Sequence, residues 1–413
     1  MSRIRGLVIV GGGAAGIGAA REAAVRGLDA LIIEARDRLG GRAHTIDWQG
    51  HQLDLGCTWL HSAERNSLRG EAERIGAAIE RKVTNWSSQY HDLGFSAEEQ
   101  EEAWAAFEAI EERMRADPPR SDRASDALEP GNPWNAFLNA ISGYINGAPL
   151  NEVSVADWLA YDNGSTDQNW RLPGGYGSLL SELGAQFEHR LATRATAISR
   201  LADAVQISTE NDVIEAERVI VTVPTSTLHR IRFDPPIEGL FEAAEQLPLG
   251  NADKLFLALE GAEEFPQATH LLGNPRSAET GSYFLNPMGM PVVEAFFGGL
   301  GARALASSDQ EAAAFAGDEL AGLLGSSIRK RLSLIAVSHW AREPWIEGSY
   351  SHARPGHAAD RARLASAGDE RIAFAGEAVS AEDYSTAHGA FDSGRAAVDR
   401  LFGPSLAHRN ARS

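Results

Sequence analysis

The stretch that decides the fold lies at the N-terminus, where residues 4–16 read IRGLVIVGGGAAG. The apolar run at 4–10, rich in Val and Ile, is typical of a buried parallel strand. Good helix formers follow at 14–26, and a second apolar run occupies 28–33. This order predicts a strand, a glycine-rich turn, a helix and a second strand, which together make one βαβ unit of about 30 residues.

The turn of this unit has the spacing G-x-G-x-x-G at Gly11, Gly13 and Gly16, with Ala14 and Ala15 before the last glycine. The first glycine permits a tight turn, the second lets the backbone approach a pyrophosphate, and the third lets helix and strand pack closely. The N-terminus of the helix then faces the anion. The motif therefore predicts a dinucleotide site.

Further along the chain, other segments extend this site. Glu34 ends the second strand about 20 residues on, where an acidic residue binds ribose hydroxyls. Residues 36–42 read RDRLGGR, and a second glycine pair beside a basic residue suits another approach to phosphate. Residues 375–377, AGE, follow the last predicted strand and suit one more backbone contact to an extended cofactor. Because these contacts come from both ends of the chain, we expect a discontinuous cofactor domain.

The composition narrows the class of partner. The 413 residues include 38 Lys and Arg against 57 Asp and Glu, a formal net charge of −19. This charge argues against nucleic acid, and it suits either steering of a cationic substrate or plain solubility. No apolar stretch approaches the ~20 residues of a membrane span, and the N-terminus lacks the layout of a signal peptide. The single cysteine, Cys57, cannot form an internal disulfide, so we expect a cytoplasmic protein.

The rest of the chain alternates between helical and strand patterns. Ser96 and Glu99 have capping-box spacing, and Trp104, Phe107 and Ile110 then recur at helical spacing. Further elements are predicted from alternating or apolar runs and their turn signals. These are helices around 133–160 and 386–401 and strands at 204–208, 218–223, 254–259 and 371–375.

The order of several short motifs resembles the flavin-containing amine oxidase family. The motifs are DLGCTWLH at 54–61, RLPGGY at 171–176, VTVP at 221–224, and the segments 340–350 and 374–377. The resemblance covers nearly the whole chain. It is nearest to polyamine and spermine oxidases and also extends to monoamine oxidases and flavin-dependent histone demethylases.

The resemblance implies an α/β fold in two interleaved parts. A Rossmann-like FAD-binding domain of the glutathione-reductase type is expected at 1–75, 180–240 and 345–405. An α+β substrate domain of the amine oxidase type, with a mixed sheet, is expected at 76–179 and 241–344. Residues 406–413 are expected to form a loose tail.

The resemblance also implies FAD as the cofactor. Ser349 stands where monoamine oxidases carry the cysteine that bonds to the flavin, so the FAD is expected to be non-covalent. No metal site is expected. The expected cofactor contacts are Gly11, Gly13, Ala14, Ala15, Gly16, Glu34, Ala35, Arg36, Gly41, Arg42, Gly56, Cys57, Thr58, Trp59, Ala197, Val223, Trp340, Gly376, Glu377, Thr386 and Ala387.

Two residues carry most of the catalytic expectation. Lys254 lies in an apolar strand, where a charge is costly unless it is paired, and in the family a lysine here holds a water against flavin N5. The alternative is a solvent-facing lysine on an edge strand. Tyr350 matches one wall of the aromatic cage that orients the amine, and Thr386 stands where monoamine oxidases have the second tyrosine.

Three more side chains could have either a role in the active site or a purely structural one. His61 matches a histidine that contacts the substrate of polyamine oxidases near the reacting nitrogen, although a lone histidine is more often structural. Trp340 matches a tryptophan beside the flavin and could equally be core. Cys57 is expected to be a buried, inert thiol.

The implied activity is oxidation of a small-molecule amine. Hydride would pass from the carbon beside nitrogen to flavin N5, the imine would hydrolyse to an aldehyde, and O2 would give hydrogen peroxide. A polyamine-type substrate is the first expectation. The alternatives are another amine (aromatic, cyclic or alkaloid) or an L-amino acid, with O2 or a carrier protein as acceptor, and a non-catalytic flavin-binding scaffold. No oligomeric state is predicted, and no carboxylate is assigned to the far end of the substrate.

Overall fold

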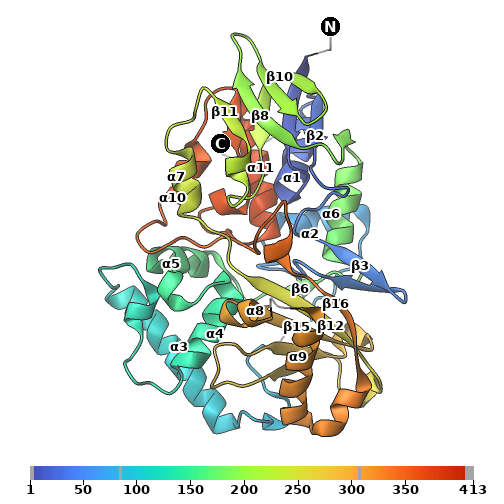
Figure 1. The fold of residues 1–413 in the computed structure, drawn as a ribbon, viewed down its shortest axis with the longest axis vertical. Helices are drawn as coiled ribbons and strands as arrows, with labels where there is room; N and C mark the ends of the chain where they lie inside the picture. The colour runs from blue at the N-terminus through green and yellow to red at the C-terminus, as the bar shows by residue number, and fades with distance from the viewer. Residues whose placement is uncertain (1–3, 83–85, 306–307, 405–413) are drawn as a thin grey trace.

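The computed structural model describes residues 4–82, 86–305 and 308–404, so the tail expected at 406–413 lies outside the described residues. Figure 1 shows two bodies joined by several crossings of the chain. The upper body holds a large sheet with α1 (Ala14–Val25) and α11 (Ala387–Phe402), the first and last helices. The lower body holds an antiparallel sheet and most of the remaining helices.

The large sheet has a parallel centre. Each neighbouring pair among five of its strands is parallel, as the predicted βαβ unit requires. These strands are β1 (Arg5–Val10), β2 (Ala30–Ile33), β7 (His189–Arg190), β10 (Val213–Val221) and β17 (Ile372–Phe374). Beyond β10 the sheet continues with β9 (Val205–Thr209), β8 (Ala195–Arg200) and β11 (Arg232–Asp234). The pairs β10–β9 and β9–β8 are antiparallel, and the pair β8–β11 is parallel.

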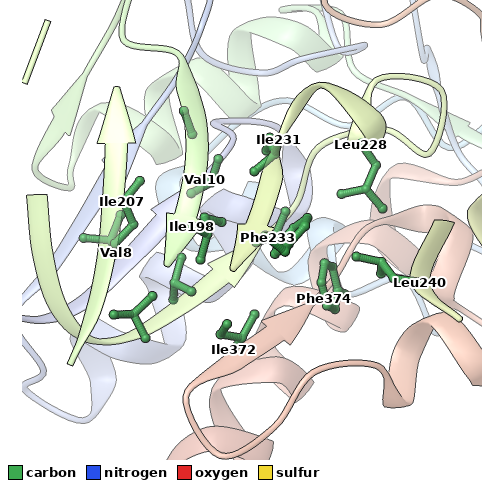
Figure 2. Close-up of a cluster of buried hydrophobic side chains, with 14 of the residues drawn as sticks. Val8, Val10, Ile198, Ile207, Leu228, Ile231, Phe233, Leu240, Ile372 and Phe374 are labelled. Carbon is green, nitrogen blue, oxygen red and sulfur yellow. The ribbon is translucent and has the colours of Figure 1, made fainter. Parts of the chain in front are cut away.

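Strand β1 is buried on both faces, as the continuous apolar run predicted. Leu7 and Ile9 pack with α1 and α11. Val8 and Val10 belong to the cluster on the opposite face, which also contains Ile372 and Leu240 (Figure 2). The second face is covered by α7 (Leu240–Glu245) and α10 (Asp360–Ser366), whereas α6 (Tyr176–Ala185) packs against α1.

The first and last helices lie in close contact. A Cβ added to Gly394 would stand 1.9 Å from the carbonyl oxygen of Ala15, and one added to Gly18 would stand 2.1 Å from that of Phe391. Only glycine permits this approach. Thus the two ends of the chain meet beside the glycine-rich turn.

The lower body is called the substrate body below, after the domain expected at 76–179 and 241–344. It contains one antiparallel sheet of five strands. Its strands are β13 (Thr269–Leu272), β14 (Ser282–Leu285), β15 (Val292–Gly298), β12 (Ala252–Leu259) and β16 (Leu332–Val337). The expectation of a mixed sheet is wrong, because every pair in it is antiparallel. The expectation of an edge-strand lysine is also excluded, since β12 lies between β15 and β16 and Lys254 is buried.

The helices of the substrate body follow the sequence patterns. Ser96 caps α3 (Ala97–Ala116) in a capping box with Glu99, as predicted. The other helices are α4 (Asn135–Asn146), α5 (Val155–Gly164), α8 (Leu300–Ala304) and α9 (Asp309–Leu324). None of the helices within the described ranges is long and apolar enough to cross a membrane.

Smaller elements join the two bodies. They are β3 (Thr45–Trp48) paired with β4 (His51–Asp54), and β5 (Trp59–Leu60) paired with β6 (Trp170–Arg171). Helix α2 (Ser67–Ile75) packs against α11 in the upper body. The expected domain division at 179/180 falls inside α6, and the division at 240/241 falls after the first residue of α7. Both helices pack into cores of the upper body, through Tyr176 and Leu240.

We predict that Gly394→Ala forces α1 and α11 apart. Overpacking of this kind costs about 1–3 kcal/mol of unfolding free energy, and FAD affinity should fall with it because the glycine-rich turn precedes α1. Urea unfolding and FAD titration measure the two effects. Gly317→Ala is the matched control, since a Cβ at that α9 position meets nothing within 4 Å and should stabilise by roughly 0.5–1 kcal/mol. Equal behaviour of the two variants would contradict the close approach.

Candidate active site

A single cavity of about 770 Å³ runs from the end of β2 into the substrate body. Its lining includes Glu34 and Arg36 at one end and Trp104 and Phe107 of α3 at the other. All five expected catalytic residues line it: His61, Lys254, Trp340, Tyr350 and Thr386. The expected cofactor contacts line it as well, apart from Gly16 and Ala197. The structure thus brings residues from both chain ends and both bodies to one site.

Gly16 and Ala197 lie outside the lining. A Cβ at Gly16 would stand 1.9 Å from the carbonyl oxygen of Gly11, so this glycine permits close packing behind the turn. Ala197 lies within β8 opposite Arg232 of β11. The lining residues nearest to it in sequence are 193–195, which come just before and at the start of β8.

The glycine-rich turn fits a pyrophosphate. Helix α1 begins after Gly13 with no side-chain cap, and Ala14 and Ala15 line the cavity, so the backbone N–H groups of the first turn are available to an anion. A Cβ at Gly13 would meet only the Cα of Gly41, at 3.9 Å, which leaves the cavity side of the turn open.

Glu34 is fixed in place at the end of β2. Its two carboxylate oxygens accept hydrogen bonds from the backbone N–H groups of Gly12 (2.6 Å) and Arg36 (2.9 Å). Burial raises the pKa of Glu34, and these two bonds act against that rise. The carboxylate lines the cavity where the motif places a ribose.

A second polar cluster lies where the C-terminal segment crosses the cavity. The Arg42 guanidinium donates to the carbonyl oxygen of Ser349 (2.5 Å) and to Glu377 (2.9 Å). Glu377 begins the short 3-10 helix η9 (Glu377–Val379) and also accepts from the Ser351 hydroxyl (2.6 Å). Although burial acts to raise it, the pKa of Glu377 is lowered, chiefly by the charge of Arg42.

Ser349 itself offers an unused polar atom. Its Oγ is buried and has no hydrogen-bond partner among the described residues, and the residue lines the cavity. A buried hydroxyl of this kind suits a polar cofactor beside it. With the open glycine turn and the fixed Glu34, it makes the lining fit FAD.

Lys254 is buried and paired. Its Nζ donates to Glu294 Oε1 of β15 at 2.9 Å and to the hydroxyl of Thr58. Glu294 Oε2 in turn accepts from Arg171 at 2.5 Å. Burial acts to raise the pKa of Glu294, but the charges of Arg171 and Lys254 outweigh it and lower that pKa to about 2.

The aromatic side chains expected at the site are held by their polar atoms. The Tyr350 hydroxyl donates to the carbonyl oxygen of Tyr144 at 2.6 Å, and burial raises its pKa. Trp340 Nε1 donates to the carbonyl oxygen of Leu55 at 3.0 Å. Thr386 caps α11: its hydroxyl accepts from the N–H of Gly389 at 3.0 Å and donates to the backbone behind it. These bonds fix both rings in orientation.

His61 is oriented by an amide. Its Nδ1 lies 2.7 Å from Asn169 Oδ1, and Asn169 Nδ2 donates to the carbonyl oxygen of Asp167 at 3.2 Å, which fixes the amide. Nδ1 therefore carries the hydrogen, and Nε2 is left as an acceptor. Burial lowers the pKa of His61 to about 4, so the ring is neutral near pH 7. Desolvation likewise raises the pKa of Cys57 to about 12, as suits an inert thiol, although Cys57 is half-buried and lines the cavity instead of being fully buried as expected.

Sequence reasoning missed most of the substrate end of the cavity. That end is aromatic, with Trp86, Phe95, Trp104, Phe107, Phe137, Tyr144, Tyr161, Phe284 and Phe296 in the lining. Trp104 and Phe107 were assigned to a helix by their spacing, but periodicity does not distinguish core from cavity wall. Glu294 carried a usable signal: like Lys254, it is a charge within an apolar strand.

Comparison with known proteins decides the family. A sequence profile of the flavin containing amine oxidoreductases matches residues 14–402. The chain belongs to this family. Its profile spans both bodies of the fold and every expected site residue except those of the first glycines, Gly11 and Gly13.

Individual members and structures agree with this assignment. The chain is 29% identical to polyamine oxidase 4 of Oryza sativa subsp. japonica, over 95% of this chain and 88% of that protein. It is 27% identical to nicotine dehydrogenase of Pseudomonas putida, over 61% of this chain and 60% of that protein. A solved structure of putrescine oxidase bound to putrescine superimposes with a TM-score of 0.80 at 20% identity, over 97% and 100% of the two chains, and so shares the fold.

The protein is thus an FAD-dependent oxidoreductase that acts on amine donors. The expected fold class, a Rossmann-like cofactor domain with an amine oxidase substrate domain, is confirmed. Within the lining, the glycine turn and Glu34 would hold the dinucleotide part of FAD. Arg42 would stand beside the phosphates, as the glycine pair before it suggests, and Ser349 and Thr58 would border the ring.

We predict that His61 makes the protein less stable in acid. The unfolded chain takes up a proton on this histidine below about pH 6.5, whereas the folded chain does so only near pH 4, so stability falls as pH drops between those values. The loss is at most about 3 kcal/mol. His61→Gln removes it, while His44 and His352, whose pKa values burial also lowers, contribute equally in both proteins. Urea unfolding at pH 7.5 and 4.5 should therefore show the smaller acid loss in the variant, and parallel losses would refute the assignment.

Proposed function

We propose that this flavoenzyme oxidises a small polyamine-type amine at the carbon beside a nitrogen, with O2 as the electron acceptor and FAD held non-covalently. The observation that carries the proposal is the meeting of Lys254, Tyr350 and His61 with the dinucleotide turn in one cavity. The polyamine class is supported by the named relatives, polyamine oxidases above all. Non-covalent FAD is supported by the hydroxyl, in place of a thiol, at Ser349.

The carboxylates that line the cavity limit where the distal ammonium of a polyamine could bind. Four carboxylates line it within the described ranges. Those of Glu34, Glu294 and Glu377 each accept hydrogen bonds on both oxygens. Asp167 is exposed and lines the same cavity. It lies near His61, because the Asn169 side chain hydrogen-bonds both to His61 and to the backbone carbonyl of Asp167. We therefore assign the distal ammonium of the substrate to Asp167.

The cavity residues also set the protonation state of the reacting nitrogen. An alkylamine has a pKa near 10.4, about six units above that of His61, so the histidine is a hydrogen-bond acceptor for the amine and too weak a base to deprotonate it at equilibrium. The aromatic lining favours the neutral amine by desolvation, and the proton leaves to water. The Tyr350 ring, held through Tyr144, orients the amine. When bound, FAD supplies the hydride acceptor at ring N5, and the imine product hydrolyses in water.

A second candidate substrate is an aromatic or alkaloid monoamine. The observation that favours it is the aromatic substrate end of the cavity, where Trp86, Tyr161 and Phe284 present ring surface and the described lining offers no free carboxylate besides Asp167. The relative named nicotine dehydrogenase is in keeping with it. Such a substrate would not need Asp167.

We predict the outcome of an anaerobic bleaching screen on the purified yellow protein. Spermine, spermidine, putrescine and acetylated polyamines should reduce the flavin, with aromatic amines and amino acids tested beside them. Asp167→Asn should weaken the apparent affinity for polyamines by roughly tenfold, which is the loss of one charge-assisted contact, and should leave aromatic monoamines unaffected. Bleaching only by aromatic amines would select the second candidate. A protein bleached by no amine would overturn the proposal.

We predict that Tyr350→Ala lowers kcat/KM for the amine by roughly tenfold or more, because the ring no longer orients the nitrogen. FAD retention should change much less. Tyr350→Phe is the matched control: it keeps the ring and loses only the bond to Tyr144, at about 1 kcal/mol of stability. Turnover and the released-flavin fraction are measured for both. Parallel loss of turnover and FAD in Tyr350→Ala would make the residue structural.

A further inference from the structure

Three buried charges form a chain at the wall of the cavity. Arg171 donates to one oxygen of Glu294 at 2.5 Å, and Lys254 donates to the other at 2.9 Å. The exposed fractions of Arg171, Glu294 and Lys254 are 7%, 4% and 7%. Glu294 and Lys254 line the cavity, whereas Arg171 stands behind them.

The strand register creates the chain. Lys254 of β12 is opposite Phe296 of β15, and Phe256 is opposite Glu294, so Lys254 and Glu294 are diagonal neighbours on one face of the sheet. Arg171 comes from β6, outside this sheet, and its guanidinium stacks on the ring of Trp59 at 4.7 Å.

Thr58, which also accepts from Lys254, directly precedes Trp59. Because Arg171 is opposite Trp59 in the antiparallel β5–β6 pair, this two-stranded sheet supplies the brace on Glu294 and lies directly beside the second contact of the lysine. The charged chain therefore joins the substrate sheet to the segment that borders the cofactor.

The charges do not cancel. Within the chain of three residues, two cations and one anion leave a net charge of +1. The buried carboxyl of Asp54, which the charge of Lys254 also reaches, accepts from the backbone N–H groups of Tyr176 and Gly177 and belongs to a separate cluster. An ammonium buried without a carboxylate would be costly and would give up its proton or its position. With each oxygen of Glu294 on one cation, neither cation is left unpaired, and no oxygen remains for a substrate ammonium.

We propose that Glu294, braced by Arg171, is the positioning residue that holds the Lys254 ammonium against Thr58 and so keeps a fixed positive charge at the ring end of the cavity. Hydride transfer adds two electrons and one proton to the ring, hence one negative charge, and a fixed cation favours that state. The proposal rests on the FAD and the Lys254 placement of the proposed function. It does not rest on the identity of the amine.

The test is the two-electron reduction potential of the bound flavin in the FAD-loaded protein, which needs no substrate. Lys254→Met removes the cation and should lower the reduction equilibrium constant at least tenfold, about 30 mV. Glu294→Gln should shift it in the same direction, because the ammonium is no longer held. The double variant should match Lys254→Met alone, since Glu294 acts through the lysine.

Three outcomes for the potential would count against the proposal. A Glu294 that acted only by its own negative charge would, on removal, raise the potential. Additive shifts in the double variant would mean that Glu294 acts independently of Lys254, and an unchanged potential in Glu294→Gln would mean that it has no such role. A protein that binds FAD but is bleached by no amine would fail the proposed function and leave this test intact.

Two further variants separate positioning from loss of stability. Glu319→Gln is the matched control, since Glu319 of α9 accepts from the Tyr283 hydroxyl at 2.6 Å in the same body but does not line the cavity. It should lower stability without moving the potential. If Glu294→Gln does not fold, Arg171→Lys weakens the brace and keeps the charge, and it should lower the potential by less than Lys254→Met. A rise in Arg171→Lys would overturn the proposal.

Discussion

The burial of β1 on both faces is the constraint on which the rest of the structure depends. One face of the strand packs on α1 and α11, and the other packs on the cluster that includes Leu240 and Ile372. A strand enclosed in this way has one position and one register, between β2 and β10. Its C-terminal end therefore fixes where the glycine-rich turn stands, and the cavity is built outward from that turn.

Local patterns predicted the parts of this fold that are local. The βαβ unit, the Ser96 cap and the N-terminus of α11 follow from periodicity and capping residues, which act over a few positions. The antiparallel pairing around β12 could not be predicted in that way, because strand direction in a sheet is set by contacts between segments far apart in sequence. The same limit explains why residues 193–195, and not Ala197, line the cavity. A shift of two residues along β8 leaves the alternation of the strand unchanged, so the sequence pattern does not say which of its residues reaches the cavity.

At the site, the resemblance to the amine oxidase family predicted the residues that belong to its motifs. It gave no prediction for cavity residues outside those motifs. The carboxylate of Glu294 offsets the free-energy cost of burying the Lys254 ammonium, yet Glu294 lies 40 residues from Lys254 in sequence. Much of the aromatic wall comes from α3, α4 and α5, whose apolar stripes resemble those of ordinary core helices, and the rest includes Phe284 of β14 and Phe296 of β15. A hydrophobic stripe reports burial, and burial against a cavity and burial against protein leave the same pattern in the sequence.

The contact of the first helix with the last one has a consequence for the order of folding. Ala15 and Gly394, which meet in this contact, are separated by most of the described residues. Contacts between segments so far apart in sequence form slowly, because a long loop must close first. We therefore expect the packing behind the pyrophosphate turn to be completed late in folding, and FAD to bind tightly only once α11 has docked.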